Sequence, residues 1–267
     1  MVPPRQQQPS REREIRTDIP HTARIWNYWM GGRQNYEVDR RVGSAATELD
    51  PGITALAAES RRFLRRAVEH LAGDLGITQF LDIGAGLLAT DNTHEVACRR
   101  NPAARVVYVD NDPLVLTHGR TLLTDPRAVY LDADLREPDR LFARAADILD
   151  LDRPVAVMFM GVLGHCERIG ELRAVVADSM ARVCRGSYLA YWDGTTDSAD
   201  FVRMCATYEN VTAVPYFPRD HCELRSIFSE LELLEPGFVP LTRWRRPAGE
   251  PVPTVPVSGY GAVARKP

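Results

Sequence analysis

The spacing of apolar residues changes along the chain from a helical pattern to an alternation of short apolar runs with helical stretches. The helical pattern covers 17–76, where Asp50-Pro51 is a helix start signal and apolar residues recur at helical spacing until Gly76. The later runs at 106–109 and 155–160 are apolar throughout, which is typical of strands buried on both faces of a parallel sheet. We therefore predict N-terminal helices followed by an α/β domain.

The alternation of strands and helices predicts the fold class, an α/β protein with a doubly wound, mostly parallel, seven-stranded sheet. The predicted strands lie at about 79–83, 105–109, 128–131, 155–160, 187–192, 231–235 and 257–264, and the later helices at about 92–101, 113–123, 138–149, 170–184, 197–208 and 220–229. Residues 1–16 are rich in Pro, Gln, Arg and Glu and are predicted to be disordered. The predicted domains are therefore this tail, an N-terminal helical cap at 17–76 and an α/β domain at 77–267.

Composition narrows the class of protein. The 33 basic and 36 acidic side chains leave a net charge of −3 with no block of Lys or Arg, which argues against nucleic acid as a partner. The longest apolar run, 154–164, is much shorter than the roughly 20 residues of a membrane helix, and no apolar segment follows the N-terminal arginines as in a signal peptide. The five cysteines include no CxxC pair, which fits a reducing compartment. We expect a cytoplasmic protein with no membrane partner and no metal site.

The clearest chemical signal is the segment 80–86, Phe-Leu-Asp-Ile-Gly-Ala-Gly, in which a predicted strand enters a glycine turn. Gly84 and Gly86 let the backbone pass close to a ligand at the carboxyl end of the strand. A dinucleotide site would carry a third glycine where this chain has Ala89, and Asp82 would repel a pyrophosphate. Asp82 suits instead the ammonium group of S-adenosylmethionine, a ligand without phosphate. The turn therefore predicts an S-adenosylmethionine site.

Two further acids end the next two predicted strands. Asp110 lies where its two oxygens can accept from both ribose hydroxyls, and Asp134 lies where it can accept from the adenine amino group. Strand-end aspartates are common turn formers, but three at successive strand ends favour a ligand site. Together with their neighbours, the predicted cofactor-binding residues are Asp82, Gly84, Ala85, Gly86, Asp110, Asn111, Asp134 and Leu135.

Six further motifs lie at 21–40, 61–68, 92–97, 109–113, 132–135 and 233–237, the first of them HTARIWNYWMGGRQNYEVDR. With them, the sequence resembles the class I S-adenosylmethionine-dependent methyltransferases over about 19–266, and most closely a bacterial S-adenosyl methyltransferase family common in high-GC soil bacteria. The resemblance implies a Rossmann-like methyltransferase fold with a reversed last strand. It also implies that the N-terminal helices lie over the cofactor pocket.

Four departures from the family pattern cluster at the expected pocket. Ser60 stands where the family usually has Asn, and Leu88 where it usually has Pro. Gly164 separates Leu163 from His165, which are usually adjacent, and the loop 215–218 is longer and more aromatic than usual. None of these departures changes a predicted cofactor-binding residue. They bear instead on which substrate the pocket accepts.

Methyl transfer depends on alignment, and a general base is needed only when the acceptor loses a proton. His165 is the candidate catalytic base, with a structural histidine bonded to backbone as the alternative of equal weight; His221 and Asp193 are weaker candidates. Arg24 and Arg33 are candidates to hold the methionyl carboxylate or an acid group of the substrate, with Arg24 as the predicted cofactor residue and surface solvation as the alternative for both. Aromatic rings can stabilise a sulfonium and grip a flat substrate, although core packing explains any single ring. The candidate substrate residues are Trp26, Tyr28, Trp29, Trp192, Tyr216 and Phe217.

Three hypotheses about function follow. The first is a methyltransferase that uses S-adenosylmethionine and acts on N, O or C of a small aromatic or heteroaromatic metabolite, with specialised metabolism as its setting. The second is a catalytically silent S-adenosylmethionine-binding regulatory protein. The third, a nicotinamide-dependent oxidoreductase, is disfavoured by Asp82 and Ala89. A monomer and a homodimer are both compatible with the sequence.

Overall fold

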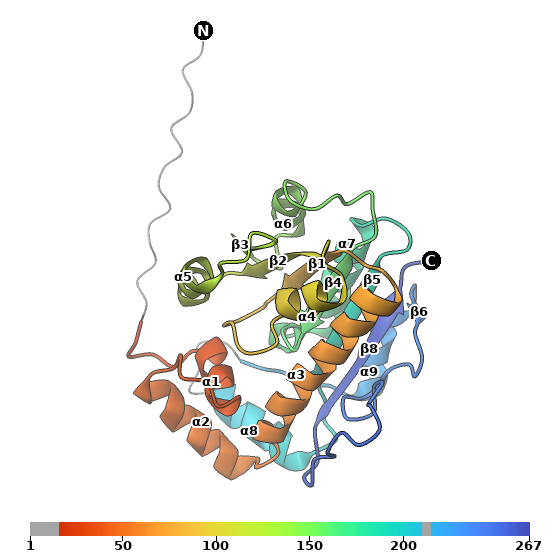
Figure 1. Cartoon of the computed structure of the whole chain (residues 1–267). Helices are drawn as coiled ribbons and strands as arrows, with labels where there is room; N and C mark the ends of the chain where they lie inside the picture. Colours follow the sequence, from red (N-terminus) through yellow and green to blue (C-terminus); the bar gives the residue numbers. More distant parts are fainter. Residues whose placement is uncertain (1–15, 210–214) are drawn as a thin grey trace.

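The computed structural model describes residues 16–209 and 215–267. The tail predicted at 1–16 lies outside the described residues except for Arg16. Figure 1 shows the described chain as one twisted sheet with helices on both of its faces.

Eight strands form the sheet of the described residues: β1 (Gln79–Ile83), β2 (Arg105–Asp110), β3 (Ala128–Asp132), β4 (Ala156–Met160), β5 (Tyr188–Gly194), β6 (Glu232–Leu233), β7 (Val239–Pro240) and β8 (Gly259–Arg265). Their order is β3-β2-β1-β4-β5-β8-β6, with β7 also paired to β8. Strands β1 to β5 are parallel, and β8 is antiparallel to β5. The predicted doubly wound, mostly parallel sheet with a reversed last strand is confirmed. The additional strand, β7, has two residues, too few to show a pattern in the sequence.

The helices cover the sheet in two layers. Helices α3 (Ile53–Glu69), α4 (Thr93–Arg100) and α5 (Pro113–Leu122) pack on one face, and α6 (Pro138–Ala145), α7 (Ile169–Ala181) and α9 (His221–Arg225) pack on the other. Successive strand residues point into the two layers: in β4, Met158 belongs to the first core and Phe159 to the second. Because both faces are covered, the sequence of β4 is apolar throughout.

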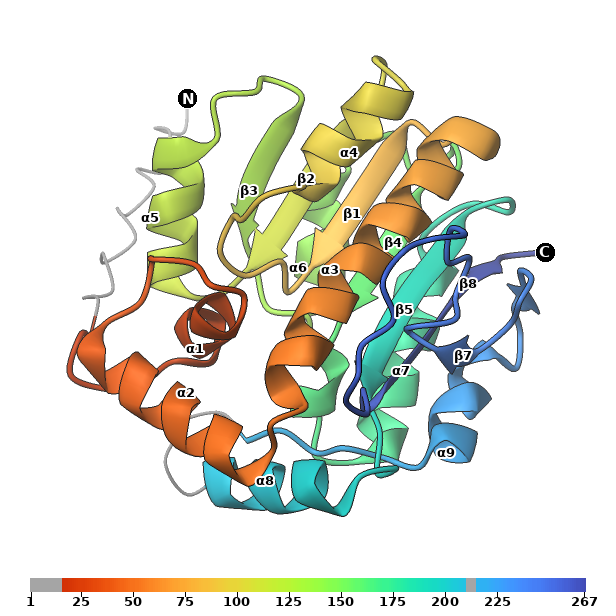
Figure 2. The same cartoon turned by 60° about the horizontal axis from the view of Figure 1, so that its bottom comes forward.

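Three N-terminal helices, α1 (Thr22–Trp29), α2 (Glu37–Leu49) and α3, precede the first strand. Figure 2 shows α1 and α2 beyond the carboxyl ends of the strands, near α8 (Ala199–Glu209), whereas α3 runs along the sheet. The buried carboxylate of Asp39 joins α1 to α2, since it pairs with Arg24 at 2.8 Å and accepts from the backbone N of His21 at 3.0 Å. Because α3 shares a core with the sheet, the domain boundary at 76 stays a prediction.

The N-terminal helical segment ends at Gly76, as predicted. Helix α3 continues into a π-helical turn at His70–Asp74, and Gly76 follows with φ +68°, a conformation that favours glycine. Helix α6 is shorter than predicted: it ends at Ala145, although the apolar pattern continues to the buried Leu149. The helix predicted at 220–229 is α9 followed by a 3₁₀ turn at Ser226–Phe228. Apolar periodicity alone does not separate helices from turns that bury the same side chains.

Candidate active site

A cavity of about 300 Å³ lies at the carboxyl ends of the parallel strands. Its walls come from β1, β2, β4 and β5, from the segments that follow β1, β2, β3 and β4, from α1, α3 and α8, and from Tyr216. The strand order reverses here between β1 and β4, which is where doubly wound sheets bind ligands. The volume falls at the lower end of the range for small-molecule sites.

The glycine turn after β1 borders this cavity. Gly84 has a φ of +74° and Gly86 a φ of +65°, values that favour glycine. The backbone N atoms of Gly84 and Ala85 both donate to the carbonyl of Val109, at 2.8 and 3.2 Å, which fixes the turn against β2. A β-carbon on Gly86 would meet no atom within 4 Å, so the backbone there faces open space. The turn therefore brings main chain to the cavity, as the sequence predicts.

Asp82 presents an unpartnered charge at the cavity. Its side chain is 3% exposed, its Oδ2 accepts from the Thr93 hydroxyl at 2.6 Å, and its Oδ1 has no hydrogen-bond partner. Burial raises the pKa of Asp82 to about 6, because the charged form is poorly solvated. A buried carboxylate with a free oxygen fits the ammonium group of an amino acid.

Arg61 of α3 faces the same part of the cavity and was missed by the sequence analysis. Its Nη2 donates to the carbonyls of Thr90 and Asp91, both at 2.9 Å, and its Nε has no hydrogen-bond partner. Burial lowers the pKa of Arg61, and the charge of Asp82 opposes that shift. The two side chains form no direct ion pair, so each retains an unsatisfied atom. An α-amino acid, with one ammonium and one carboxylate, complements both, and the residues present therefore fit the methionyl part of S-adenosylmethionine.

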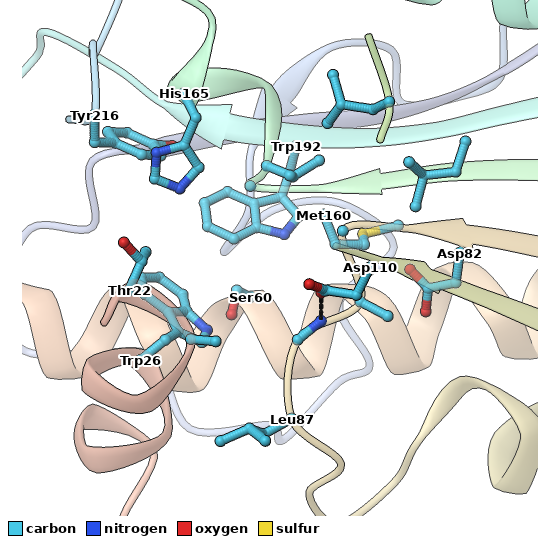
Figure 3. A pocket seen from close by; sticks show the side chains of 18 of the residues that line it. Thr22, Trp26, Ser60, Asp82, Leu87, Asp110, Met160, His165, Trp192 and Tyr216 are labelled. Atoms are coloured by element: carbon cyan, nitrogen blue, oxygen red, sulfur yellow. Dashed lines mark hydrogen bonds between the residues drawn. The ribbon is translucent and has the colours of Figure 1, made fainter. Parts of the chain in front are cut away.

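Asp110 is fixed against the glycine turn. Its Oδ2 accepts from the backbone N of Gly86 at 2.9 Å (Figure 3), and its Oδ1 accepts from the backbone N of Asp112, also at 2.9 Å. Burial raises the pKa of Asp110, and these two backbone donors oppose the rise. Each oxygen keeps capacity for a further hydrogen bond, which suits the ribose hydroxyls.

The other predicted residues of the adenosine end also reach the cavity. Asn111, Asp134 and Leu135 all line it, and the Asn111 Nδ2 donates to Asp134 Oδ2 at 3.2 Å. The second oxygen of Asp134 accepts from the backbone N of Arg136 at 2.9 Å. The structure therefore brings together all eight residues that the strand-end pattern predicted for the cofactor.

His21, another residue that the sequence analysis missed, holds helix α1 over the adenosine end of the cavity. The Nδ1 of His21 accepts from the backbone N of Ala23 at 3.3 Å and so caps α1. Its Nε2 lies 2.7 Å from Asp112 Oδ2, and the other oxygen of Asp112 caps α5. One side chain thereby links the starts of α1 and α5.

The other end of the cavity is apolar and aromatic. The rings of Trp26 of α1 and Trp192 of β5 stack with centroids 5.9 Å apart, and Trp29 meets Trp26 edge-on at 5.6 Å. Helix α8 closes this end with side chains that sequence reasoning did not assign. They are Phe201, Met204 and Cys205, which lie three and four residues apart and so share one face of the helix.

His165 lies in the cavity wall, in the 3₁₀ turn Leu163–His165 after β4. Its Nδ1 is 2.7 Å from the carbonyl oxygen of Pro215, and its ring meets that of Tyr216 edge-on at 5.3 Å. Burial lowers the pKa of His165, so the neutral imidazole is favoured. The residue thus has the backbone bond of a structural histidine and the location of a base, and its role stays a prediction.

Three predicted site residues lie elsewhere. Arg24 is 3% exposed and is bound by Asp39 and by backbone carbonyls of the preceding segment, and it does not line the cavity, whereas Arg61 does. The Tyr28 hydroxyl lies 3.1 Å from Ser44 Oγ, and neither Tyr28 nor Phe217 lines the cavity. Helical periodicity explains the sorting within α1, because Trp26 and Trp29 face the cavity while Arg24 and Tyr28 lie on other faces. Of the weaker candidates, Arg33 is exposed and His221 does not line the cavity.

Residues 16–209 and 215–267 contain neither a metal-binding group of side chains nor a membrane-spanning helix. They hold no group of three or more His, Cys, Asp or Glu side chains arranged to bind a metal ion. In the same part of the chain, no helix has both the length and the apolar character needed to cross a membrane.

Several solved structures resemble the chain over nearly its whole length. A protein from Thermobifida fusca that has been assigned as a methyltransferase is 36% identical with a TM-score of 0.86, over 94% of this chain and 97% of that chain. A DUF574-family protein from Streptomyces avermitilis is 36% identical with a TM-score of 0.89, over 94% and 99%. An S-adenosylmethionine-dependent methyltransferase from Anabaena variabilis is 11% identical with a TM-score of 0.53, over 96% and 100%, and shares the fold alone.

A search of the curated proteins finds no match to the chain. The family described as S-adenosyl methyltransferase matches residues 8–267. This match spans both the glycine turn with its three acids and the helices that cover them. The chain therefore belongs to the S-adenosyl methyltransferase family.

Proposed function

We propose that the protein transfers the methyl group of S-adenosylmethionine to N, O or C of a small aromatic or heteroaromatic metabolite, in specialised metabolism. The observation that carries the proposal is a single cavity with two chemically different ends. One end has the polar and charged groups that the cofactor requires, and the other has the stacked rings of Trp26 and Trp192.

The order of the strands supports a defined order of binding positions for the cofactor and the acceptor along the edge of the sheet. Asp134 follows β3, Asp110 ends β2, Asp82 lies in β1 and Trp192 lies in β5, in the order β3-β2-β1-β4-β5. Adenine, ribose and the amino-acid group would therefore bind in this sequence from β3 to β1. The acceptor would bind beyond them, over β4 and β5.

When bound, the cofactor supplies an electrophilic methyl group on a positively charged sulfur. The role of this chain is to hold the acceptor in line with that methyl group and to exclude water. Faces of tryptophan attract a cation by roughly 0.5–2 kcal/mol, and they offer a flat acceptor a stacking surface. Trp26 and Trp192 are placed for both tasks at the acceptor end.

His165 would hold the proton of acceptors that lose one. Its Nδ1 is engaged by the Pro215 carbonyl, which leaves Nε2 as the basic nitrogen of the neutral ring. For an acceptor X–H, the proton that X loses on methylation would move to the Nε2 of His165. Acceptors that carry no such proton would not need His165.

Two experiments test the proposal in turn. Calorimetry with S-adenosylmethionine, S-adenosylhomocysteine and NADH should show binding of both sulfur ligands in the micromolar range and no binding of NADH. No binding of either sulfur ligand would overturn the proposal. Labelled cofactor incubated with a panel of indoles, phenols and amines should then yield a methylated product. Binding without transfer to any of them would favour the regulatory protein.

A further inference from the structure

We propose that Tyr216 and Asp193 are positioning residues that hold the His165 imidazole in one tautomer, with Nε2 facing the cavity. They do so through one backbone carbonyl, that of Pro215. Only the use of Nε2 as a base rests on the proposed function; the tautomer itself does not.

The contact between His165 and Pro215 determines where the proton of the neutral ring lies. A carbonyl oxygen can only accept, so the Nδ1 that lies 2.7 Å from the Pro215 oxygen must donate. The neutral ring has one N–H, and Nε2 is therefore left with a lone pair. In Figure 3 the ring nitrogen away from Tyr216 points toward the space beside Trp192. The orientation of one carbonyl thus sets which nitrogen the cavity meets.

The Pro215 carbonyl is held in place by the residue that follows it. The Tyr216 hydroxyl donates to Asp193 Oδ1 and accepts from the backbone N of Gly194 at 2.9 Å. Asp193, at the end of β5, is 1% exposed, and its Oδ2 accepts from the Tyr191 hydroxyl at 3.4 Å. The aromatic loop is thereby anchored to the centre of the sheet rather than to the surface.

A second bond fixes the loop directly to the turn that carries His165. The backbone N of Phe217 donates to the carbonyl of Gly164 at 2.7 Å. The Tyr216 ring occupies the space beside Gly164, where a β-carbon would lie 2.3 Å from the ring and 2.8 Å from Asp193 Oδ1. His165, Gly164, Tyr216 and Asp193 therefore form one packed unit.

The chemistry of this unit favours positioning over simple packing. A buried carboxylate without a direct ion pair is costly, and burial raises the pKa of Asp193 to about 6, a shift that the charge of Arg219 only partly opposes. An apolar pair would fill the same volume without that cost. The carboxylate instead accepts a hydrogen bond that fixes the orientation of the Tyr216 side chain. That orientation in turn holds the carbonyl of the preceding residue, Pro215, toward His165.

The test is the tautomer of His165, read by long-range ¹H–¹⁵N spectra of the full chain labelled at histidine. The chain has six histidines, and a His165→Gln variant assigns the signal. At a pH where the ring is neutral, we expect a protonated Nδ1 and an unprotonated Nε2 in the wild-type protein. In Tyr216→Phe the signals should move toward the Nε2–H form. A wild-type ring protonated at Nε2, or an unchanged spectrum in Tyr216→Phe, would overturn the proposal.

Two further variants distinguish a specific effect on the His165 tautomer from a general loss of structure. Tyr28→Phe removes a hydroxyl bonded to Ser44 outside the cavity and should leave the His165 signal unchanged. Asp193→Asn keeps an oxygen for the Tyr216 hydroxyl and removes the charge, so a smaller displacement is expected. If Tyr216→Phe does not fold, an unchanged signal in Asp193→Asn refutes the positioning role.

Activity gives a second readout that separates the two proposals. With an acceptor that loses a proton, Tyr216→Phe should lower kcat by at least about tenfold and leave the affinity for S-adenosylhomocysteine within about twofold. If no acceptor is methylated by the wild type, the proposed function fails, and the spectra still decide the tautomer. If methylation proceeds and the Tyr216→Phe tautomer is unchanged, only the positioning role fails.

Discussion

The ring of Tyr216 lies against the backbone of Gly164 so closely that a β-carbon at residue 164 would come within 2.3 Å of its Cζ atom. From the sequence, we expect Gly164 and the aromatic loop to be departures from the family pattern. The structure shows Gly164 in contact with Tyr216, 52 residues further along the chain. The glycine makes room for the ring, which connects both residues to the placement of His165.

Gly164→Ala should therefore destabilise the protein. The added methyl group must displace the Tyr216 ring or the Asp193 carboxylate, and such overpacking lowers the free energy of unfolding by about 1–3 kcal/mol. Chemical denaturation of the two proteins measures the difference. Gly170→Ala in α7 is the matched control, because a β-carbon there meets no atom within 4 Å and Ala favours helix. Equal stability of Gly164→Ala and the wild type would contradict the packing described.

Cofactor affinity should fall at low pH because of Asp82. The ammonium group binds the ionised carboxylate, and the pKa of Asp82 in the free protein is about 6. Below that pH the proton must leave before the ligand binds, so the Kd for S-adenosylhomocysteine should rise about tenfold per pH unit. Calorimetry between pH 5 and 8 measures this change, since the range extends about one unit below and about two units above the pKa of Asp82. Asp82→Asn should bind weakly at every pH; a wild-type Kd that stays constant across the range argues against the assignment.

Arg61→Met should separate the amino-acid end of the ligand from the rest. Loss of a charge-assisted contact to the carboxylate should weaken S-adenosylhomocysteine by about ten- to a hundredfold, which corresponds to about 1.5–3 kcal/mol. Methylthioadenosine, which lacks the amino acid, should bind as well as to the wild type. Weakening of both ligands would instead indicate that Arg61 serves the loop through Thr90 and Asp91. The exposed Arg33→Met is the control and should change neither affinity.

Asp110→Asn should show the complementary pattern. Its amide group would place a donor against one of the two backbone N–H groups that the carboxylate now accepts from, and it removes the charge that we propose binds the ribose. S-adenosylhomocysteine and methylthioadenosine should both weaken, by about tenfold or more. Asp132→Asn, at the end of the neighbouring strand and outside the cavity lining, should change neither. Full affinity in Asp110→Asn would remove this residue from the site.

The pH dependence of methyl transfer should identify His165. Protonated imidazole cannot take up a proton, and burial lowers the pKa of His165 below its ordinary value of 6.5. With acceptors that lose a proton, kcat should therefore stay constant down to a pH below 6.5 and then fall. His165→Gln should lower that kcat by about a hundredfold or more, and should not affect acceptors without a proton to lose. An unchanged kcat in His165→Gln rules the residue out as a base.

Local periodicity in the sequence is enough to predict most of the secondary-structure elements. Uninterrupted apolar runs such as that of β4 indicate burial on both faces, and parallel strands place their carboxyl ends at one edge. Asp82, Asp110 and Asp134 therefore meet at that edge, because each lies within two residues of the carboxyl end of its strand. The glycine turn was visible for the same reason, since its positive φ values restrict it to a short local pattern.

The distant side chains that complete the site become apparent once the packing of the elements is known. Arg24 and Arg61 both lie on N-terminal helices, and no local pattern distinguishes the arginine that pairs with Asp39 from the one that faces the cavity. The α8 wall and the contact of Tyr216 with Gly164 depend on packing between segments far apart in the chain. Periodicity determines which face of an element is buried, whereas the partner of that face is determined by how the elements pack together.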